Sequence, residues 1–248
     1  MQITTSDTKN TVASIRPNLS ISKSQALPLP FPLENLDLES FIKFTLDPFD
    51  TQAVINMQKM LVTSPRRPEM IKHVEAIIAA DKEFVQLYNV KYFPQFPTTA
   101  QLSAYPEGTF GKVVANHLIL NGIELDFAGI DISVFLKQEM TLIGYLGIRG
   151  IRTHDLYHAV LGIGTTPIDE YTLTSFTLAQ FASPYHMMIV ASGYLHTAFH
   201  TPELIPHFLA ETNRFYQLGK KAKSFIGFKF EEHFGTPIDE LRKTLNLQ

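Results

Sequence analysis

Dipeptides in which a capping residue precedes a proline recur along the chain, each ahead of apolar residues with helical spacing. They are Asp47-Pro48, Ser64-Pro65, Thr166-Pro167, Thr201-Pro202 and Thr236-Pro237. A Ser, Thr or Asp side chain can accept from the first free amides of a helix, and proline fits the first helical position. A further apolar run with helical period, Thr109 to Leu120, ends at Asn121-Gly122, a typical helix stop. Convincing alternating strands are hard to find, so the pattern predicts an all-α fold.

The chain is expected to form one helical domain after a flexible arm. Residues 1–30 are rich in Ser, Thr, Asn and Lys, and a proline-rich run from Leu27 to Pro32 closes this arm. Residues 31–248 contain no obvious linker and suit a single-domain helical bundle. With 45% apolar and 18% charged residues, the chain can bury a sizeable core.

Composition excludes several classes of protein. The 21 basic and 24 acidic residues give a net charge of −3, so no nucleic-acid partner is expected. Cysteine is absent, which leaves His, Asp and Glu as the ligands of any metal site. The longest stretch without charged residues, Tyr171 to Pro202, is broken by Pro184 and carries three histidines. Because a spanning helix needs about 20 predominantly apolar residues, this stretch predicts two buried helices that line the interior.

The segment that is most informative about chemistry is His154-Asp155-Leu156-Tyr157-His158. On a helix, His158 lies about 40° and Asp155 about 100° around the axis from His154, so the three polar side chains share one face. Two imidazoles four residues apart can bind one divalent ion, and the adjacent carboxylate offers an oxygen ligand. The alternative interpretation is structural: His154 pairs locally with Asp155, and His158 is a half-buried histidine.

A second carboxylate follows twelve residues after this segment. Gly162 to Gly164 end the first helix, and Thr166 with Asp169 has the form of a capping box, which puts Glu170 in the first turn of the next helix. A helical hairpin could bring Glu170 back to the histidines and form a metal site between two helices. Nitrogen and oxygen ligands without sulfur suit Zn²⁺ first, with Fe²⁺, Mn²⁺ or Mg²⁺ as alternatives.

Glycines recur every third residue before the histidine motif, at Gly144, Gly147 and Gly150. Gly144 and Gly147 lie on the same helical face as the candidate ligands. Each glycine costs about 1 kcal/mol relative to alanine within a helix, so a reason for them is expected. One reason is close helix packing, and the other is a groove for a slender apolar ligand. We assign Gly144, Gly147 and Ile151 as the candidate groove residues.

Other catalytic classes fit the residues less well. The other seven histidines are expected to be structural or exposed. A phosphohydrolase of the His-Asp type could use His117 and Asp239, but His158 and Glu170 would then be unexplained. A metallopeptidase is disfavoured because the general-base glutamate of the HExxH motif is replaced here by the shorter Asp155.

Three motifs carry a resemblance to a known family. They are His154-Asp155-Leu156-Tyr157-His158 with Val160-Leu161-Gly162 and Glu170, the segment Tyr105 to Gly111, and Glu203-Leu204-Ile205-Pro206. With these motifs, the chain resembles the Coq4 family of ubiquinone-biosynthesis proteins from about Phe49 to its C-terminus. It departs from the family pattern at Asp169, where the family usually has glycine. A second departure is the glycine-rich segment 144–150, where the family has a basic, charge-rich helix.

The resemblance implies an all-α fold and a polyprenyl lipid or quinone precursor as ligand. It also implies a divalent ion bound by His154, Asp155, His158 and Glu170, which would be the catalytic residues. One implied activity removes the C1 carboxylate of a polyprenyl-hydroxybenzoate, with hydroxylation at that carbon. The alternative is a non-catalytic prenyl-lipid binder or scaffold that organises other quinone-biosynthesis proteins. We expect a homodimer, cytoplasmic or peripheral on a membrane surface without spanning it; in a eukaryote this would be the matrix side of the inner mitochondrial membrane.

Overall fold

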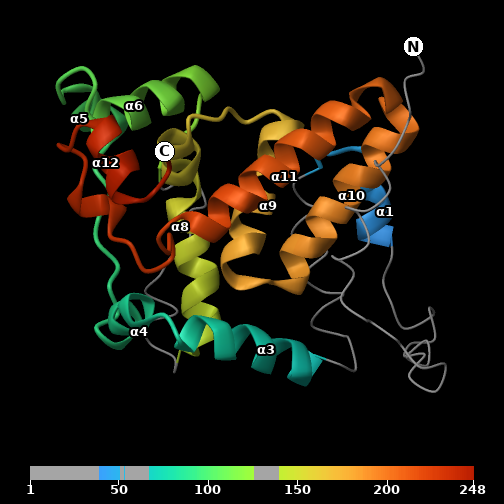
Figure 1. The fold of residues 1–248 in the computed structure, drawn as a ribbon. Coiled ribbons are helices and arrows are strands. Elements are labelled where there is room, and N and C mark those ends of the chain that lie inside the picture. Colours follow the sequence, from blue (N-terminus) through green and yellow to red (C-terminus); the bar gives the residue numbers. More distant parts are fainter. Residues whose placement is uncertain (1–38, 51–52, 54–66, 126–139) are drawn as a thin grey trace, which may run out of the picture. The chain divides into compact units, whose positions relative to one another are not determined.

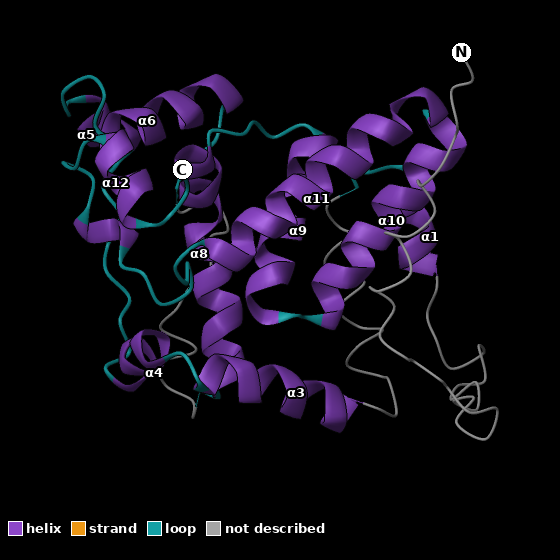
Figure 2. Ribbon diagram, viewed as in Figure 1, coloured by secondary structure: helices purple, strands orange, loops and turns teal. Residues whose placement is uncertain are grey.

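All regular elements that the computed structural model describes are helices (Figure 2). The described residues are 39–50, 53, 67–125 and 140–248. Within these ranges no strand forms, which confirms the all-α prediction, whereas the boundary of the arm near residue 30 lies outside them. The helices (Figure 1) are α1 Glu39–Leu46, α3 Arg67–Ala79, α4 Lys82–Asn89, α5 Thr99–Ser103, α6 Phe110–Asn121, α8 Leu142–Leu161, α9 Pro167–Phe181, α10 Pro184–His200, the 3-10 helix η3 Pro202–Leu204, α11 Ile205–Lys221, the 3-10 helix η4 Phe230–Glu232 and α12 Ile238–Thr244.

Two predicted helix starts are confirmed in detail. Thr109 caps α6 by accepting from the amide of Lys112, and Gly122 ends this helix with a φ of 65°. Thr166 caps α9 in a reciprocal capping box with Asp169. Local side-chain chemistry therefore fixes the ends of these helices.

The starts predicted at Thr201 and Thr236 are displaced along the chain. After Thr201 the backbone forms η3, and α11 begins at Ile205, because Pro206 can occupy only the first turn of a helix. The carbonyl of Thr236 accepts from the amide of Phe110, and α12 begins two residues later, at Ile238.

The predicted starts near the N-terminus fall at the edge of the described residues. Asp47 directly follows α1, and Asp50, not Asp47, accepts from the amide of Ala53 at 2.8 Å, as a helix cap does. The cap predicted at Ser64 lies outside the described residues, and α3 is described from Arg67.

A main hydrophobic core surrounds the C-terminal half of α8. It joins α6, α8, α9 and the C-terminal segment after α11, with Leu118, Leu156, Phe176, Phe225 and Leu241 all fully buried. A second cluster packs α3 and α4 against the N-terminal half of α8. In Figure 1, α8 accordingly runs from α3 and α4, which lie at its N-terminal end, to α6 and α12, which lie at its C-terminal end. The helix with the histidine motif is thus held along its whole length.

The uncharged stretch Tyr171 to Pro202 forms most of α9, all of α10 and the turn between them. The two predicted helices are confirmed, and the burial is confirmed for α9, but it is wrong for much of α10. There Met187, Leu195 and Phe199 expose 54%, 40% and 77% of their surface. Among the described helices, none combines the length and the apolar character needed to cross a membrane.

Candidate metal centre

The hairpin between α8 and α9 positions the histidine motif and Glu170. His154 and His158 lie one turn apart in the C-terminal part of α8, which Gly162 ends with a left-handed φ of 71°. The capping box at Thr166 then starts α9, with Glu170 in its first turn. A carboxylate is favourable at this position because the N-terminus of a helix carries a partial positive charge. The turn between the helices is short, so the three side chains meet.

The three side chains converge closely enough to hold one ion. Glu170 Oε2 lies 3.4 Å from His154 Nε2, and Glu170 Oε1 lies 3.3 Å from His158 Nε2. One ligand atom from each of the three residues lies within 4.8 Å of the others. The His158 side chain is fully buried, whereas those of His154 and Glu170 are 45% and 39% exposed. The group is therefore closed on one side and open to solvent on the other.

Asp155, the fourth predicted ligand, lies beside this group and not within it. Its Oδ1 is 3.6 Å from His154 Nδ1, while Glu170 faces the Nε2 atom of the same ring. Carboxylates in this position commonly orient a metal-binding imidazole from behind. That Asp155 is a direct ligand stays a prediction.

Charges within the group shift two pKa values in opposite directions. Burial alone would lower the pKa of His154, but the carboxylates of Asp155 and Glu170 outweigh it and raise this pKa to about 9. Burial would raise the pKa of Glu170, but His154 and His158 hold it well below its usual range. Because His154 and Glu170 are partly exposed, solvent screens part of both effects. Without an ion, the group thus favours a protonated imidazole between two carboxylates.

Two histidines that the sequence analysis treated as structural flank the group. The ring of His117 on α6 lies 5.5 Å from that of His158, centroid to centroid, and burial lowers its pKa. His186 on α10 packs edge-on against Phe181, and burial, followed by the charge of His154, lowers its pKa to about 4. Neither residue belongs to a local motif, so no spacing in the sequence could have indicated this placement.

The candidate groove residues lie on an open face of α8. A side chain added at Gly147 would meet no described atom within 4 Å, and Ile151 is 50% exposed. At Gly144 an added Cβ would lie 3.3 Å from Thr141 Oγ1, which is a tighter fit. The face of α8 that carries Gly147 and Ile151 is therefore not used for close helix packing by the described residues.

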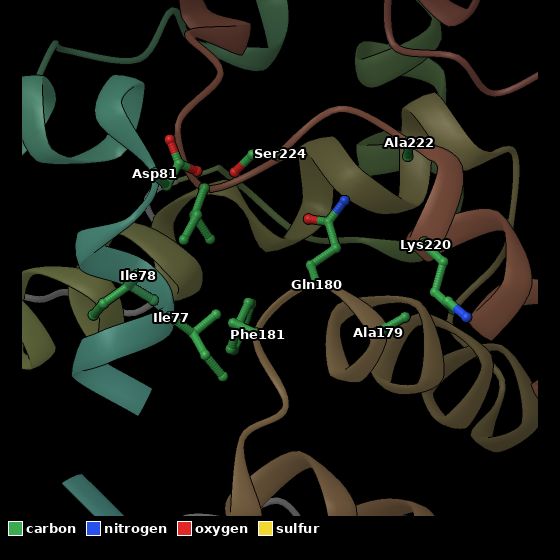
Figure 3. A pocket seen from close by; sticks show the side chains of 11 residues that line it. Ile77, Ile78, Asp81, Ala179, Gln180, Phe181, Lys220, Ala222 and Ser224 are labelled. Carbon is green, nitrogen blue, oxygen red and sulfur yellow. The ribbon is translucent and has the colours of Figure 1, made fainter. Parts of the chain in front are cut away.

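A cavity of about 320 Å³ lies elsewhere, between the C-terminal ends of α3, α9 and α11 (Figure 3). Ile77, Phe181 and Gln180 line it together with Asp81 and Lys220. It shares no residue with the candidate metal centre or with the candidate groove, so we treat it as separate from both.

Fold and site together define an all-α protein with two histidines of one helix facing a carboxylate of the next. The family model described as "Coenzyme Q (ubiquinone) biosynthesis protein Coq4" matches residues 60–248. The chain therefore belongs to the Coq4 family of ubiquinone-biosynthesis proteins.

Individual relatives agree with this assignment. The chain is 28% identical over 153 residues to the mitochondrial ubiquinone biosynthesis protein COQ4 homolog of Nematostella vectensis, covering 59% of this chain and 69% of the relative. For the homolog of Danio rerio the identity is 26% over 151 residues, covering 60% of this chain and 53% of the relative. The chain thus spans about half the length of the fish protein. A crystal structure of a putative ubiquinone biosynthesis protein from Nostoc punctiforme has a TM-score of 0.68 at 22% identity, over 85% of this chain and 96% of that one, which shows a shared fold.

Proposed function

We propose that the protein binds one divalent ion, Zn²⁺ foremost, through His154, His158 and Glu170. The observation that supports this is the convergence of their ligand atoms within 4.8 Å. Two imidazoles and a carboxylate are a donor set that suits Zn²⁺, Fe²⁺ or Mn²⁺, and Mg²⁺ less well. Asp155 completes the set, either as an oxygen ligand or by accepting from His154 Nδ1.

The ligand that we propose for this centre is a polyprenylated aromatic precursor of ubiquinone. Its tail would lie along the open face of α8 at Gly144, Gly147 and Ile151, where burial of apolar surface contributes about 25 cal/mol per Å². Its polar head would lie at the ion near His154 and Glu170, the exposed side of the centre. An anionic head is favoured there, because a bound cation is the largest local charge in such a site.

The reaction that we propose is removal of the C1 carboxylate of a polyprenyl-hydroxybenzoate. Loss of CO₂ leaves the bonding electron pair on C1, where a proton replaces the carboxylate. Hydroxylation at the same carbon would be a separate step that replaces this hydrogen: one atom of O₂ enters the ring and the other leaves as water, which needs a two-electron reductant as a further co-substrate. When bound, the ion would act as a Lewis acid that stabilises negative charge on the ring. The chain's own residues would orient the head and keep the tail out of water.

A second candidate function is that of a non-catalytic lipid binder or scaffold on a membrane face. The exposed apolar side chains of α10 and the start of α11 favour it, among them Phe199, Leu195 and Leu209. Exposed apolar patches commonly mark contacts with a protein partner or a membrane surface. We propose three kinds of contact for this surface: a second copy of the chain, other quinone-biosynthesis proteins, and peripheral attachment to a membrane. In a eukaryote this would be a mitochondrial membrane.

Metal analysis tests the first proposal directly. Native mass spectrometry of the purified protein should give one divalent ion per chain, and the double variant His154→Ala, His158→Ala should have none. Wild-type protein that stays metal-free after incubation with Zn²⁺, Mn²⁺ and Fe²⁺ would refute it.

Release of labelled CO₂ separates the two functions. A polyprenyl-hydroxybenzoate with a ¹³C-labelled carboxyl group should lose its label with wild-type protein under O₂ and keep it with the double variant. Binding of this compound without any release would instead support the lipid binder or scaffold.

A further inference from the structure

The ring of His158 is the most enclosed part of the centre. Within the described part of the chain, neither of its buried ring nitrogens has a hydrogen-bond partner. Nε2 faces Glu170 at 3.3 Å, on the side of the candidate ion. Nδ1 lies on a different edge of the ring. Buried polar atoms without a partner are rare in native proteins, so this nitrogen needs an explanation.

The other histidine of the centre shows what is missing. His154 has Glu170 at Nε2 and the carboxylate of Asp155 near Nδ1. This arrangement is usual, because a metal-binding imidazole almost always donates its second N–H to a carboxylate, a carbonyl or water, which fixes the tautomer and the ring orientation. His158 has the Nε2 contact, but no described residue provides a matching acceptor at Nδ1.

His117 lies next to this ring. Its Nε2 atom is buried and also has no hydrogen-bond partner among the described residues. The two rings are nearly parallel, with 16° between their planes and 5.5 Å between their centroids. Rings in full face-to-face contact would lie about 3.5–4.0 Å apart, so these rings are not stacked in this way. A half-buried imidazole and a fully buried one are thus neighbours, each with a buried nitrogen that has no partner among the described residues. A neutral imidazole can donate at one nitrogen and accept at the other.

His117 Nε2 and His158 Nδ1 are not hydrogen-bonded to each other in this structure. We propose that His117 positions His158 for metal binding: once an ion is bound, a small rotation of the rings lets Nε2 of His117 accept a hydrogen bond from Nδ1–H of His158, which holds the Nε2 lone pair of His158 toward the ion. His117 is a positioning residue and not a ligand, since it lies outside the group of converging ligand atoms. The inference rests on the proposed metal site and adds to it a residue from α6, a helix that carries no part of the motif.

Metal affinity in matched variants tests this role. His117→Phe keeps a ring of similar shape without an acceptor, His117→Gln keeps an acceptor oxygen, and His207→Phe is the control at an exposed histidine of α11. The measurements are the Kd for Zn²⁺ in competition with a chromophoric chelator and the melting temperature of the metal-free protein. His117→Phe should weaken Zn²⁺ binding about 10- to 100-fold, as loss of such outer partners does. His117→Gln should recover most of this loss, and His207→Phe should bind as wild type does.

The melting temperature separates positioning from packing. Metal-free His117→Phe should melt at or above the wild-type temperature, because an unpartnered buried nitrogen is replaced by an apolar edge. Unchanged Zn²⁺ affinity in His117→Phe, or equal losses in the Phe and Gln variants, would overturn the positioning role alone. Wild-type protein that binds no ion would overturn the metal site as well, so the two failures are distinguishable.

A spectroscopic test uses wild-type protein and does not depend on how the variants fold. In protein with ¹⁵N-labelled histidine and bound Zn²⁺, long-range ¹H–¹⁵N correlation should show His158 protonated at Nδ1. This proton should exchange slowly, with coupling across the hydrogen bond to His117 Nε2. Coordination of the ion through Nδ1 of His158, or a rapidly exchanging Nδ1 proton, would overturn the inference.

Discussion

A buried ion pair between α8 and η4 offers the sharpest test of how the helix with the ligands is held. Arg149 and Glu231 expose only 3% and 4% of their side chains and lie 2.9 Å apart. The guanidinium contacts both carboxylate oxygens and also donates to the carbonyls of Ile226 and Phe228. One side chain of α8 therefore satisfies a carboxylate and two backbone groups of the C-terminal segment.

Removing either partner should cost more than the pair itself contributes, because the remaining charge stays buried. Glu231→Met leaves the guanidinium without its counter-ion, which costs about 3–5 kcal/mol of unfolding free energy. In a chain of this size, that lowers the melting temperature by about 6–20 °C. Arg149→Met should cost more, since it also leaves two carbonyls without donors, at about 1–3 kcal/mol each.

The double variant separates the ion pair from the backbone contacts. Arg149→Met, Glu231→Met loses the two carbonyl contacts but leaves no unpaired charge, so it should be more stable than Arg149→Met alone. Urea unfolding of the four proteins gives the coupling free energy, which we expect to be about 3 kcal/mol or more. Glu211→Met is the control: it breaks a pair with Arg214 that is partly exposed to solvent and should cost at most about 1 kcal/mol. A loss below about 1 kcal/mol for Glu231→Met, or additive losses in the double variant, would refute the reasoning.

Three further expectations concern the centre and its surroundings. Gly147→Leu should block binding of long prenyl ligands while the ion stays bound and the melting temperature stays within a few degrees, because the added side chain meets open space; a stable variant with unchanged lipid affinity would place the groove elsewhere. Glu170→Ala should weaken binding of the ion and of the polar head but keep part of the tail affinity, which calorimetry with and without Zn²⁺ can measure. The pKa of His186 is about 4 in the folded state and 6.5 in the unfolded state. Between these pH values the unfolded state therefore binds a proton at His186 and the folded state does not. The contribution of His186 to stability is present above pH 6.5 and falls, by at most about 1.4 kcal/mol per pH unit, toward pH 4. Urea unfolding between pH 4 and 7 should show this slope in the wild type and a smaller one in His186→Phe; equal slopes would contradict it.

Parts of the molecule that depend on neighbouring residues were predictable from the sequence. His154, His158 and Glu170 lie within one helical hairpin, so helical spacing and a capping box suffice to bring them together. The helix starts at Thr109 and Thr166 were predictable for the same reason. The start at Thr236 was misplaced because its carbonyl pairs with Phe110, a contact across the fold that no local pattern reveals.

Contacts between distant residues were not predictable. Arg149 and Glu231 are 82 residues apart, and neither lies in a pattern that indicates a partner. His117 stands in an ordinary helical run, and only the packing of α6 against α8 places it at His158. The exposure of α10 was missed because an uncharged sequence predicts burial, whereas parts of α10 have no cover among the described residues.

The face of α8 with the candidate ligand His154 is open to solvent, whereas the face with Arg149 is buried. Variants on the two faces can therefore separate metal binding from stability. His154 lies on the open face and is 45% exposed, so His154→Ala leaves no buried cavity and should abolish tight Zn²⁺ binding. Loss of its solvent-screened contacts with Asp155 and Glu170 should lower the melting temperature of the metal-free protein by only a few degrees. Glu231 touches no candidate ligand, yet it anchors α8 from the opposite face. Glu231→Met should therefore lower the melting temperature strongly, while Zn²⁺ affinity measured well below that temperature stays within a few-fold of wild type. If Glu231→Met lost the ion in a protein that is still folded, the C-terminal segment would help to set the ligand geometry, and stability alone would not describe its role.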